Sequence, residues 1–506
     1  MKNALKKGAL VSYLSVIIHV AANLLMVPIL ISEMGDSEYG LYQMVASLFS
    51  YISIFETALT AGVLRMYCTA LSSGDKQKAE NLLAICRRIY RFLTIVLLAC
   101  GSVLTVTFSF VYKGSLSAPQ IRESTVMLAL LFVNLCITMS NAVYLTVINA
   151  NEHFAFVRGL DCAVQIMNPL VCLLVLKQYP FAVTVITIQL LLNIAVALTR
   201  YIYAKKVFGA AIRLHKWEAS AAKAILIFSA GIMLSNIADQ IFWKTDQLIL
   251  GKIFDTAAVA VYSVATQIYT NYMYAGTTVA SVFMPRIAGL YSEKDGVKLI
   301  SDLFIRVGRI AFTLTFLVLT GFIIFGRQFL MLWVGKTYLP AYRLALIVML
   351  PYTIDIIQNL GLTILQVMDL FKFRAKVYLL AALSNILLTV VMAQRWGVTG
   401  AAVSTAVSMF VSSGIIMNCF YRKKVGIDIV LFWKNIALNM VKLLPLSIAA
   451  YVLFNEIIVL HGFKELGAAI AVYTLLYSLC VYFFTFNEYE KGLIGSFLKR
   501  VKKRGN

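Results

Sequence analysis

The chain has 506 residues, of which 61% are hydrophobic and only 13% are charged, and its formal net charge is +22. A soluble chain of this length needs far more charge to cover its surface, so this composition excludes an assembly of soluble domains. Apolar stretches of about 20 residues, each long enough to cross the ~30 Å hydrocarbon core as a helix, recur about 14 times. The sequence therefore predicts an all-α, polytopic membrane protein.

The apolar stretches follow one another along nearly the whole chain, with connectors mostly too short to fold alone. The predicted transmembrane helices cover, in chain order, residues 8–32, 40–66, 88–112, 123–148, 159–176, 181–203, 225–250, 257–283, 307–326, 341–366, 375–394, 398–420, 437–457 and 466–485. The first is too long for the apolar region of a cleaved signal peptide, and no small-residue cleavage pattern follows it. We therefore interpret it as a permanent helix.

The excess positive charge is distributed unevenly between alternate loops. With the N-terminus inside, about 34 of the Lys and Arg side chains lie on or next to the cytoplasmic side and about nine on the other side. Arg65 and Lys244 fall inside helices. This asymmetry follows the positive-inside rule, which explains most of the charge without a nucleic-acid partner. It predicts that both termini are cytoplasmic.

Short similarities recur within the chain. Tyr42 matches Tyr262 and Asp75 matches Asp295, at the same offset of 220 residues. Chance similarity among apolar helices is one interpretation, and an internal repeat of the kind found in transporters is the other. The repeat predicts two six-helix bundles, followed by two additional helices and a basic cytoplasmic tail. These four parts cover residues 1–205, 220–421, 437–485 and 486–506.

Polar and ionisable side chains recur at helical spacing within several predicted helices. Such side chains are costly in hydrocarbon, and they usually face a water-filled cavity or a partner helix. A wet substrate cavity between the two bundles is one interpretation, and hydrogen bonding between helices is the other. The candidate cavity residues are Asn23, Arg65, Asp239, Trp243, Lys244, Asp246, Gln267, Asn271 and Tyr274.

Some of the ionisable side chains are candidates for coupling to H⁺ or Na⁺, because a buried carboxylate or imidazole can take up a cation. They are His19, Glu56, Asp239 and Asp355. Each also has a structural interpretation as a packed or paired polar group. Lys244 either offers a cation to an anionic substrate or forms an internal ion pair with Asp239 or Asp246. Arg65 either lines the cavity or extends to the cytoplasmic interface.

The sequence contains no convincing signal for nucleotide chemistry. Gly335-Lys336-Thr337 resembles the end of a phosphate-binding loop, but Leu330 occupies the position of the first glycine of that motif. The four histidines are scattered, and no nucleophile–base grouping or metal-ligand spacing indicates an enzyme or a metal site. We predict a protein without catalytic residues, metal or cofactor, driven by H⁺, Na⁺ or another gradient.

Several short motifs, spread over essentially the whole chain, resemble those of polysaccharide flippases of the Wzx type. That superfamily also holds multidrug extruders of the MATE type and the lipid II flippase MurJ. The motifs are Gly35-Asp36-Ser37-Glu38-Tyr39-Gly40-Leu41-Tyr42, Arg65, Asp246-Gln247-Leu248-Ile249-Leu250-Gly251, Ala260-Val261-Tyr262-Ser263 and Gly397-Val398-Thr399-Gly400-Ala401-Ala402. Ala260 is a departure, because the family usually has Gly there.

The resemblance implies two bundles of six helices with two extra helices, working by alternating access in the bacterial inner membrane. The implied substrate is an oligosaccharide on a polyprenyl pyrophosphate, turned from the inner to the outer leaflet for a surface polysaccharide such as the O-antigen of lipopolysaccharide. Lys244 and Arg65, and more weakly Arg200, are the cations that would meet its anionic headgroup. Further candidate partners are membrane lipids, a polysaccharide polymerase and chain-length proteins.

Three other functions remain open at this point. An ion-coupled multidrug extruder of the same fold would use Asp239 and Asp355 to attract organic cations. An exporter of another lipid-linked precursor, such as lipid II, would share the fold as well. A membrane-embedded enzyme that transfers sugars is the most distant alternative, and the short outer loops and the two similar halves argue against it.

Overall fold

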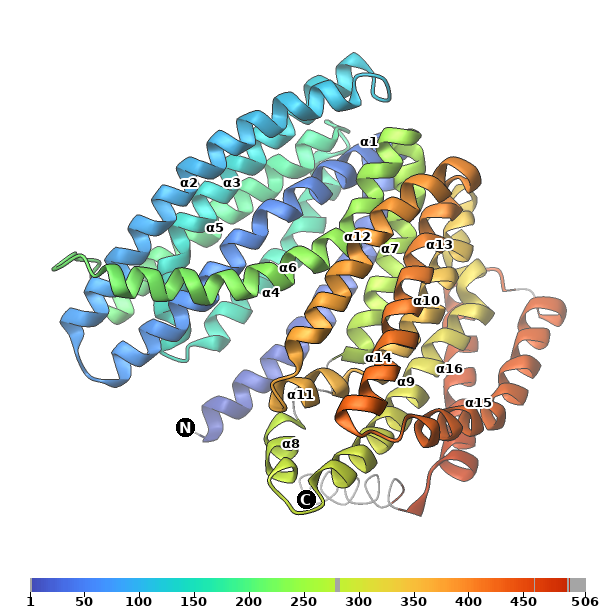
Figure 1. Cartoon of the computed structure of the whole chain (residues 1–506). Helices are drawn as coiled ribbons and strands as arrows, with labels where there is room; N and C mark the ends of the chain where they lie inside the picture. The colour runs from blue at the N-terminus through green and yellow to red at the C-terminus, as the bar shows by residue number, and fades with distance from the viewer. Residues whose placement is uncertain (1, 278–282, 459, 489–490, 492–506) are drawn as a thin grey trace. The chain divides into compact units, whose positions relative to one another are not determined.

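The computed structural model describes residues 2–277, 283–458, 460–488 and 491 (Figure 1). Within these ranges every regular element is a helix, which confirms the predicted all-α fold. Eleven helices of the described part are long and apolar enough to cross a membrane. The chain is therefore a polytopic membrane protein. Most of the predicted tail at 486–506, and residues 278–282 of the predicted helix 257–283, lie outside the described residues.

The α-helices follow closely on one another along the chain, as Figure 1 shows. They are α1 (Lys2–Ser72), α2 (Lys76–Tyr112), α3 (Ala118–Ala150), α4 (Phe154–Val175), α5 (Ala182–Phe208), α6 (Ala219–Ile253), α7 (Thr256–Thr277), α8 (Met284–Tyr291), α9 (Gly296–Trp333), α10 (Pro340–Ile357), α11 (Leu360–Val367), α12 (Phe371–Trp396), α13 (Val398–Met409), α14 (Met417–Phe420), α15 (Ile429–Val452) and α16 (Phe463–Cys480). A 3₁₀ turn lies at Lys336–Tyr338, and π-helical segments lie at Phe410–Ile416, Tyr421–Val425, Leu453–Ile457 and Val481–Thr485.

Two of these elements differ from the predicted spans in how they are divided. The predicted helices 8–32 and 40–66 both lie in α1, which bends at Gly35, where φ is 82° and ψ is 172°. The predicted helix 341–366 is interrupted between α10 and α11, where Gln358 and Asn359 leave regular helix. The bend at Gly35 falls in the predicted connector at 33–39. The break after α10 was not predicted, because a hydropathy window averages over the two residues at which it lies.

The chain divides into two compact units. Unit 1 comprises Met1–Ser263 with Ile386–Ala401, and unit 2 comprises Val264–Asn385 with Ala402–Asn506. Helices α7, α12 and α13 each contribute one part to unit 1 and another to unit 2. The predicted bundles at 1–205 and 220–421 and the additional helices at 437–485 stay a prediction.

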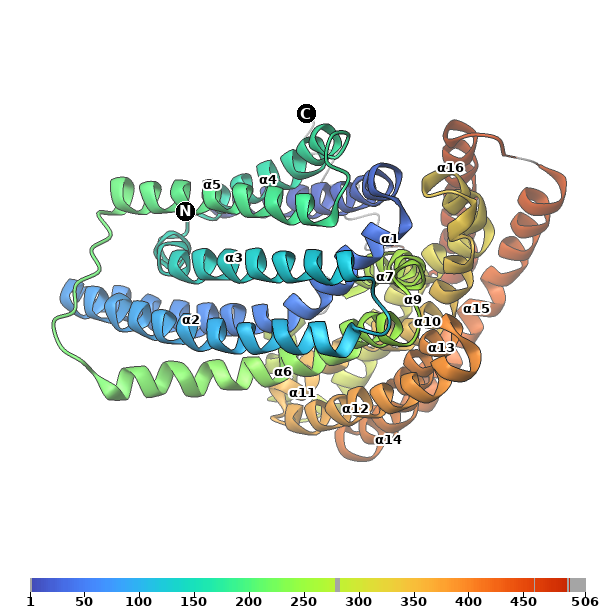
Figure 2. The same ribbon diagram turned by 90° about the horizontal axis from the view of Figure 1, so that it is seen from above.

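In unit 1, helices α2, α3 and α5 run side by side, as Figures 1 and 2 show, and α1 packs against α3, α4 and α6. Side chains from other helices fix the start of α5. The backbone N–H of Ala182 donates to Glu38 of α1 at 2.8 Å, and that of Val183 donates to Glu123 of α3 at 2.9 Å. Carboxylates at a helix N-terminus satisfy free N–H groups and complement the helix dipole.

In unit 2, α9 is the central helix, packed against α10, α15 and α16. Phe304 of α9 contacts Phe432 of α15, with ring centres 4.9 Å apart. Two tyrosines attach α16 to α9: Tyr473 donates to Thr320 Oγ1 at 2.7 Å, and Tyr477 donates to the carbonyl of Thr313 at 2.8 Å. Because these hydroxyls are buried, each needs such a partner. The last two long helices therefore belong to the core of unit 2.

Candidate functional site

The motif beginning at Gly35 forms a tight joint within unit 1. A φ of 82° at Gly35 lies in the left-handed region that favours glycine. A Cβ on Gly40 would lie 1.7 Å from the carbonyl oxygen of Thr256, so the second part of α1 touches the start of α7 directly. The Ser37 and Thr256 hydroxyls share a hydrogen bond of 2.9 Å beside this contact. Ser37 and Gly40 of this motif thus hold the backbone of α1 against that of α7.

Asp246 of α6 lies at the centre of a second joint in unit 1. Its carboxylate accepts hydrogen bonds from Tyr262 Oη at 2.5 Å and from Thr389 Oγ1 at 2.9 Å, and only 2% of the residue is exposed. Adjacent Gln247 accepts from Ser47 and donates to Ser263 at 3.1 Å. These contacts tie α6 to α1, α7 and the unit 1 part of α12. Asp246, which the sequence predicts to line the substrate cavity, is thus hydrogen-bonded in the interior of unit 1.

A polar seam joins α1 to α6. Tyr51 is hydrogen-bonded to Thr245, and Asn236 Nδ2 donates to Thr57 Oγ1 at 3.3 Å. Nearer the end of α1, the exposed Arg65 holds its guanidinium carbon 4.7 Å from the centre of the Phe228 ring. These side chains contact one another between α1 and α6, and a role of Arg65 in substrate binding stays a prediction.

Lys244 lies one residue before Thr245 of this seam and is half-buried. In the part of the chain that the structure describes, Lys244 forms no ion pair or hydrogen bond. Of its two predicted ion-pair partners, Asp246 is held by hydroxyl groups, and Asp239 is exposed. The neighbouring Trp243 makes an edge contact with Phe242, with ring centres 4.9 Å apart. A half-buried cation in a long apolar helix without a neutralising group is costly in hydrocarbon.

Arg200, by contrast, is neutralised by carboxylates within unit 1. Its guanidinium lies 3.0 Å from Asp161 of α4, its side chain is only 14% exposed, and the half-buried Glu56 of α1 also attracts it. Asp161 pairs more loosely with Arg158, at 3.8 Å. The sequence prediction missed Asp161, although an acidic residue inside the predicted helix 159–176 was a usable signal. Glu56, a candidate for ion coupling, is thus near enough to Arg200 for their opposite charges to attract.

His19 and Asn23 bond to each other within α1, with His19 Nε2 and Asn23 Nδ2 3.0 Å apart. This pairing at a spacing of four residues is the local packing role that such a pair commonly has on a helix. Both residues are half-buried and belong to unit 1.

Asp355, the ion-coupling candidate of unit 2, lies in a cluster with side chains of two other helical segments, α12 and the π-helical segment Phe410–Ile416. It accepts hydrogen bonds from Tyr378 and, at 3.0 Å, from Ser413 Oγ, and Arg374 lies 3.7 Å away. The Arg374 guanidinium carbon is 4.2 Å from the centre of the Tyr378 ring. The side chains of Arg374 and Asp355 are only 18% and 21% exposed. Sequence reasoning named Asp355 but missed Arg374, which lies in the first turn of α12.

The remaining cavity candidates belong to unit 2. Gln267 and Asn271 of α7 are half-buried, and the Asn271 Nδ2 group is buried without a hydrogen-bond partner in the described structure. The side chain of Tyr274 lies outside the described residues. Because these residues lie in unit 2 and most other candidates lie in unit 1, the predicted cavity between the bundles stays a prediction.

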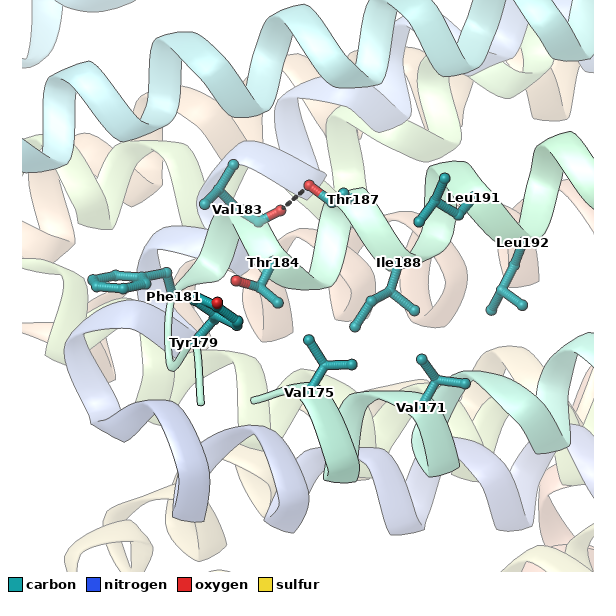
Figure 3. Close-up of a pocket in the computed structure, with 10 residues that line it drawn as sticks. All are labelled: Val171, Val175, Tyr179, Phe181, Val183, Thr184, Thr187, Ile188, Leu191 and Leu192. Atoms are coloured by element: carbon teal, nitrogen blue, oxygen red, sulfur yellow. Dashed lines mark hydrogen bonds between the residues drawn. The ribbon is translucent and has the colours of Figure 1, made fainter. Parts of the chain in front are cut away.

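Two surface grooves of unit 1 differ in chemistry. A groove of about 470 Å³ between α4 and α5 is lined by apolar side chains and threonines, with no charged residue (Figure 3). A groove of about 710 Å³ between α2, α3 and α5 is lined by apolar and aromatic side chains together with the polar Ser140 and Asn141 and the basic Arg87 and Arg91. Among the described residues, no three His, Cys, Asp or Glu side chains gather as metal ligands would.

Comparison with solved structures identifies the fold as that of a class of membrane transporters. The structure of "Lipid II flippase MurJ, inward closed conformation" matches with a TM-score of 0.74 and 14% identity, over 94% of this chain and 98% of the other. An inward-facing multidrug resistance MATE family transporter matches with a TM-score of 0.65 and 12% identity, over 81% and 94%. Identities this low establish the fold alone.

Sequence comparison then gives the family. A family profile described as "Polysaccharide biosynthesis protein" matches residues 34–343, and the chain belongs to this family. A Shigella flexneri protein named "Putative O-antigen transporter" is 19% identical over 400 residues, which cover 77% of this chain and 91% of that protein. "Uncharacterized membrane protein EpsK" of Bacillus subtilis is 21% identical over 497 residues, or 94% of each chain. The chain is thus a multi-pass membrane protein of this family, and its suspected relationship is confirmed.

Proposed function

We propose that this protein is a flippase for an oligosaccharide linked to a polyprenyl pyrophosphate. It turns this lipid from the cytoplasmic to the outer leaflet of the bacterial inner membrane by alternating access, with both of its own termini cytoplasmic. The family, whose description is polysaccharide biosynthesis, and the relative named as an O-antigen transporter support the substrate class. The fold shared with a lipid II flippase supports a lipid-linked cargo.

The observation that carries the proposal is the state of Lys244. Arg200 in unit 1 and Arg374 in unit 2 lie against carboxylates, at 3.0 and 3.7 Å, so their charges are already balanced. Lys244 has no such carboxylate among the described residues. A half-buried ammonium group of this kind gains most from a ligand that brings its own negative charge. A pyrophosphate headgroup supplies that charge, whereas an organic cation would add to the repulsion.

The transport step follows from this arrangement. The pyrophosphate approaches Lys244 while the polyprenyl chain remains in the hydrocarbon, and polar side chains replace water around the sugars. No nucleotide motif is present in the sequence, so a gradient of ions or of substrate provides the free energy. Arg65, Asp239, Trp243 and Asn23 remain the further candidates for substrate contact in unit 1, and Gln267, Asn271 and Tyr274 those in unit 2.

The proposal is tested in a strain that lacks the gene. Complete lipid-linked oligosaccharides should accumulate in the cytoplasmic leaflet, and the wild-type gene should restore their transfer. Lys244→Ala, produced at the same level, should lower the transfer rate about 10- to 100-fold, because a hydrogen bond to a charged group contributes about 1.5–3 kcal/mol. Lys223→Ala is the matched control: Lys223 is exposed on the same helix, and its loss removes an equal charge.

The outcomes separate the proposal from its alternatives. Normal transfer by Lys244→Ala would remove Lys244 from the substrate site. Normal lipid-linked sugars in the deletion strain, together with altered tolerance to cationic drugs, would instead establish a multidrug extruder. Accumulation of a lipid-linked cell-wall precursor rather than of polysaccharide units would assign the protein to export of that precursor.

A further inference from the structure

We propose that the groove between α2, α3 and α5 binds an anionic phospholipid, phosphatidylglycerol, with its headgroup at Arg87 and Arg91 and an acyl chain along the apolar part. The groove is a regulatory or structural lipid site on unit 1, distinct from the path of the transported substrate. Its assignment to the cytoplasmic leaflet rests on the proposed orientation of the termini, and the binding itself does not.

The groove changes from basic to apolar along its length. Arg87 and Arg91 lie one helical turn apart on α2, and Leu98 lies two turns further, about 10 Å along the helix axis at 1.5 Å per residue. Leu98, Val133 and Leu198 are exposed apolar side chains on the three helices that form the apolar part. A headgroup and an acyl chain of a phospholipid have this same succession of charge and hydrocarbon.

The basic end of the groove has an excess of positive charge. In the described structure neither Arg87 nor Arg91 forms an ion pair. A third cation, Lys205 of α5, lies over the ring of the groove residue Tyr201, with its Nζ 4.7 Å from the ring centre, and is close enough to Arg87 for their charges to repel. Basic pockets between transmembrane helices on the cytoplasmic side attract anionic headgroups for this reason.

Asn141 gives a second, independent indication of a ligand. It lines the groove and is only 8% exposed, and its Nδ2 donates to the carbonyl of Ala197 at 2.7 Å. Its Oδ1 is buried without a hydrogen-bond partner in the described structure. A buried acceptor without a donor costs about 1–3 kcal/mol. A headgroup that combines a phosphate with free hydroxyls satisfies both the cations and this acceptor, and the glycerol of phosphatidylglycerol provides those hydroxyls.

The groove between α4 and α5 in Figure 3 is a natural internal control. Its lining side chains, including Val171, Thr184 and Leu191, carry no charge, and Thr187 donates its hydroxyl back to the carbonyl of Val183 at 2.9 Å. Acyl chains can lie in that groove, but nothing there distinguishes one headgroup from another. Selectivity for an anionic lipid should therefore depend on the basic end of the α2–α3–α5 groove, chiefly on Arg87 and Arg91, which line it.

The test measures binding of dioleoylphosphatidylglycerol and dioleoylphosphatidylcholine to the purified full-length protein by native mass spectrometry. The wild type should bind the anionic lipid preferentially. Arg87→Gln with Arg91→Gln should reduce this preference about fivefold for each charge removed. Arg88→Gln is the matched control, because Arg88 is exposed on the same helix and does not line the groove.

A second pair of variants addresses the apolar part and guards against misfolding of the double variant. Leu98→Trp should fill the groove and lower phosphatidylglycerol binding, whereas Leu191→Trp in the α4–α5 groove should leave it unchanged. Both leucines are exposed, at 40% and 60%, so the larger ring does not enter the core of the unit.

Four results would overturn the proposal. They are equal binding of the two lipids by the wild type, equal losses in the Arg88 and Arg87/Arg91 variants, displacement of the lipid by millimolar inorganic phosphate, and tighter binding of undecaprenyl phosphate than of phosphatidylglycerol at the groove. Displacement by free phosphate would indicate a simple anion site. Preference for the polyprenyl lipid would assign the groove to the transported substrate.

Discussion

Gly40→Ala should destabilise unit 1 strongly, because the added methyl group meets backbone and not a flexible side chain. Its Cβ would lie 1.7 Å from the carbonyl oxygen and 2.6 Å from the carbonyl carbon of Thr256. Reaching the 3.0–3.4 Å of the tightest real contacts requires α1 and α7 to separate by about 1.3–1.7 Å. Overpacking costs about 1–3 kcal/mol, and the Ser37–Thr256 hydrogen bond lost with it adds about 1 kcal/mol. We expect a total near 3 kcal/mol.

Gly159→Ala is the matched control for this substitution. Gly159 lies within α4 of the same unit, and a Cβ there has no atom within 4 Å. Alanine replaces glycine favourably in an open helix interior, by about 0.5–1 kcal/mol. Thermal unfolding of the purified protein in one detergent should therefore show a Gly40→Ala midpoint several degrees below wild type and a Gly159→Ala midpoint at or above it. Equal midpoints for the two variants would refute the close approach of α1 to α7.

Two further variants test contacts within each unit. Arg374→Met leaves the Asp355 carboxylate in unit 2 without its cation, so it should cost about 2–3 kcal/mol, and adding Asp355→Leu should recover most of that loss. A double variant that melts no higher than the single one would contradict the ion pair. Glu38→Ala removes the acceptor for the Ala182 N–H at the start of α5 and should cost about 1 kcal/mol, whereas Glu38→Gln keeps an acceptor and should cost less. Melting midpoints that rank glutamine below alanine would contradict the cap.

The fold was accessible from sequence because the bilayer imposes a strict rule on length. About 20 apolar residues per span identify most of the long helices, and the structure confirms an all-α membrane protein. The connector at 33–39, which contains the bend at Gly35, was predicted as well, but the left-handed backbone conformation of Gly35 was not. The break after α10 was not predicted. It lies at Gln358 and Asn359, where Gln358 Nε2 donates to Asn418 Oδ1 at 2.8 Å, a contact between residues far apart in the chain.

For the candidate site, the sequence predicted only which residue types were unusual, and not which side chains they contact. Helical spacing identified Asp246 and Asp355 as unusual, but it did not reveal that Tyr262 and Thr389 hold one and Arg374 approaches the other. These partners lie 16, 143 and 19 positions away in sequence, so only the folded chain brings them together. The spacing of residues along one helix predicts which side chains share a face of that helix. It does not predict whether that face contacts water, lipid or another helix.

The motifs that identify the family are, in this structure, mainly devices that hold unit 1 together. Gly40 permits the contact of α1 with α7, and Asp246 and Gln247 bind α6 to its neighbours. Lys244 immediately precedes these anchored positions, because Thr245 and Gln247 are both tied to α1. The backbone that carries this cation is therefore fixed before any substrate arrives, which lowers the ordering cost of binding. If the proposed function holds, a fixed scaffold with an unneutralised charge would serve different sugars through the pyrophosphate that they share, and the motifs would define the family better than the cargo.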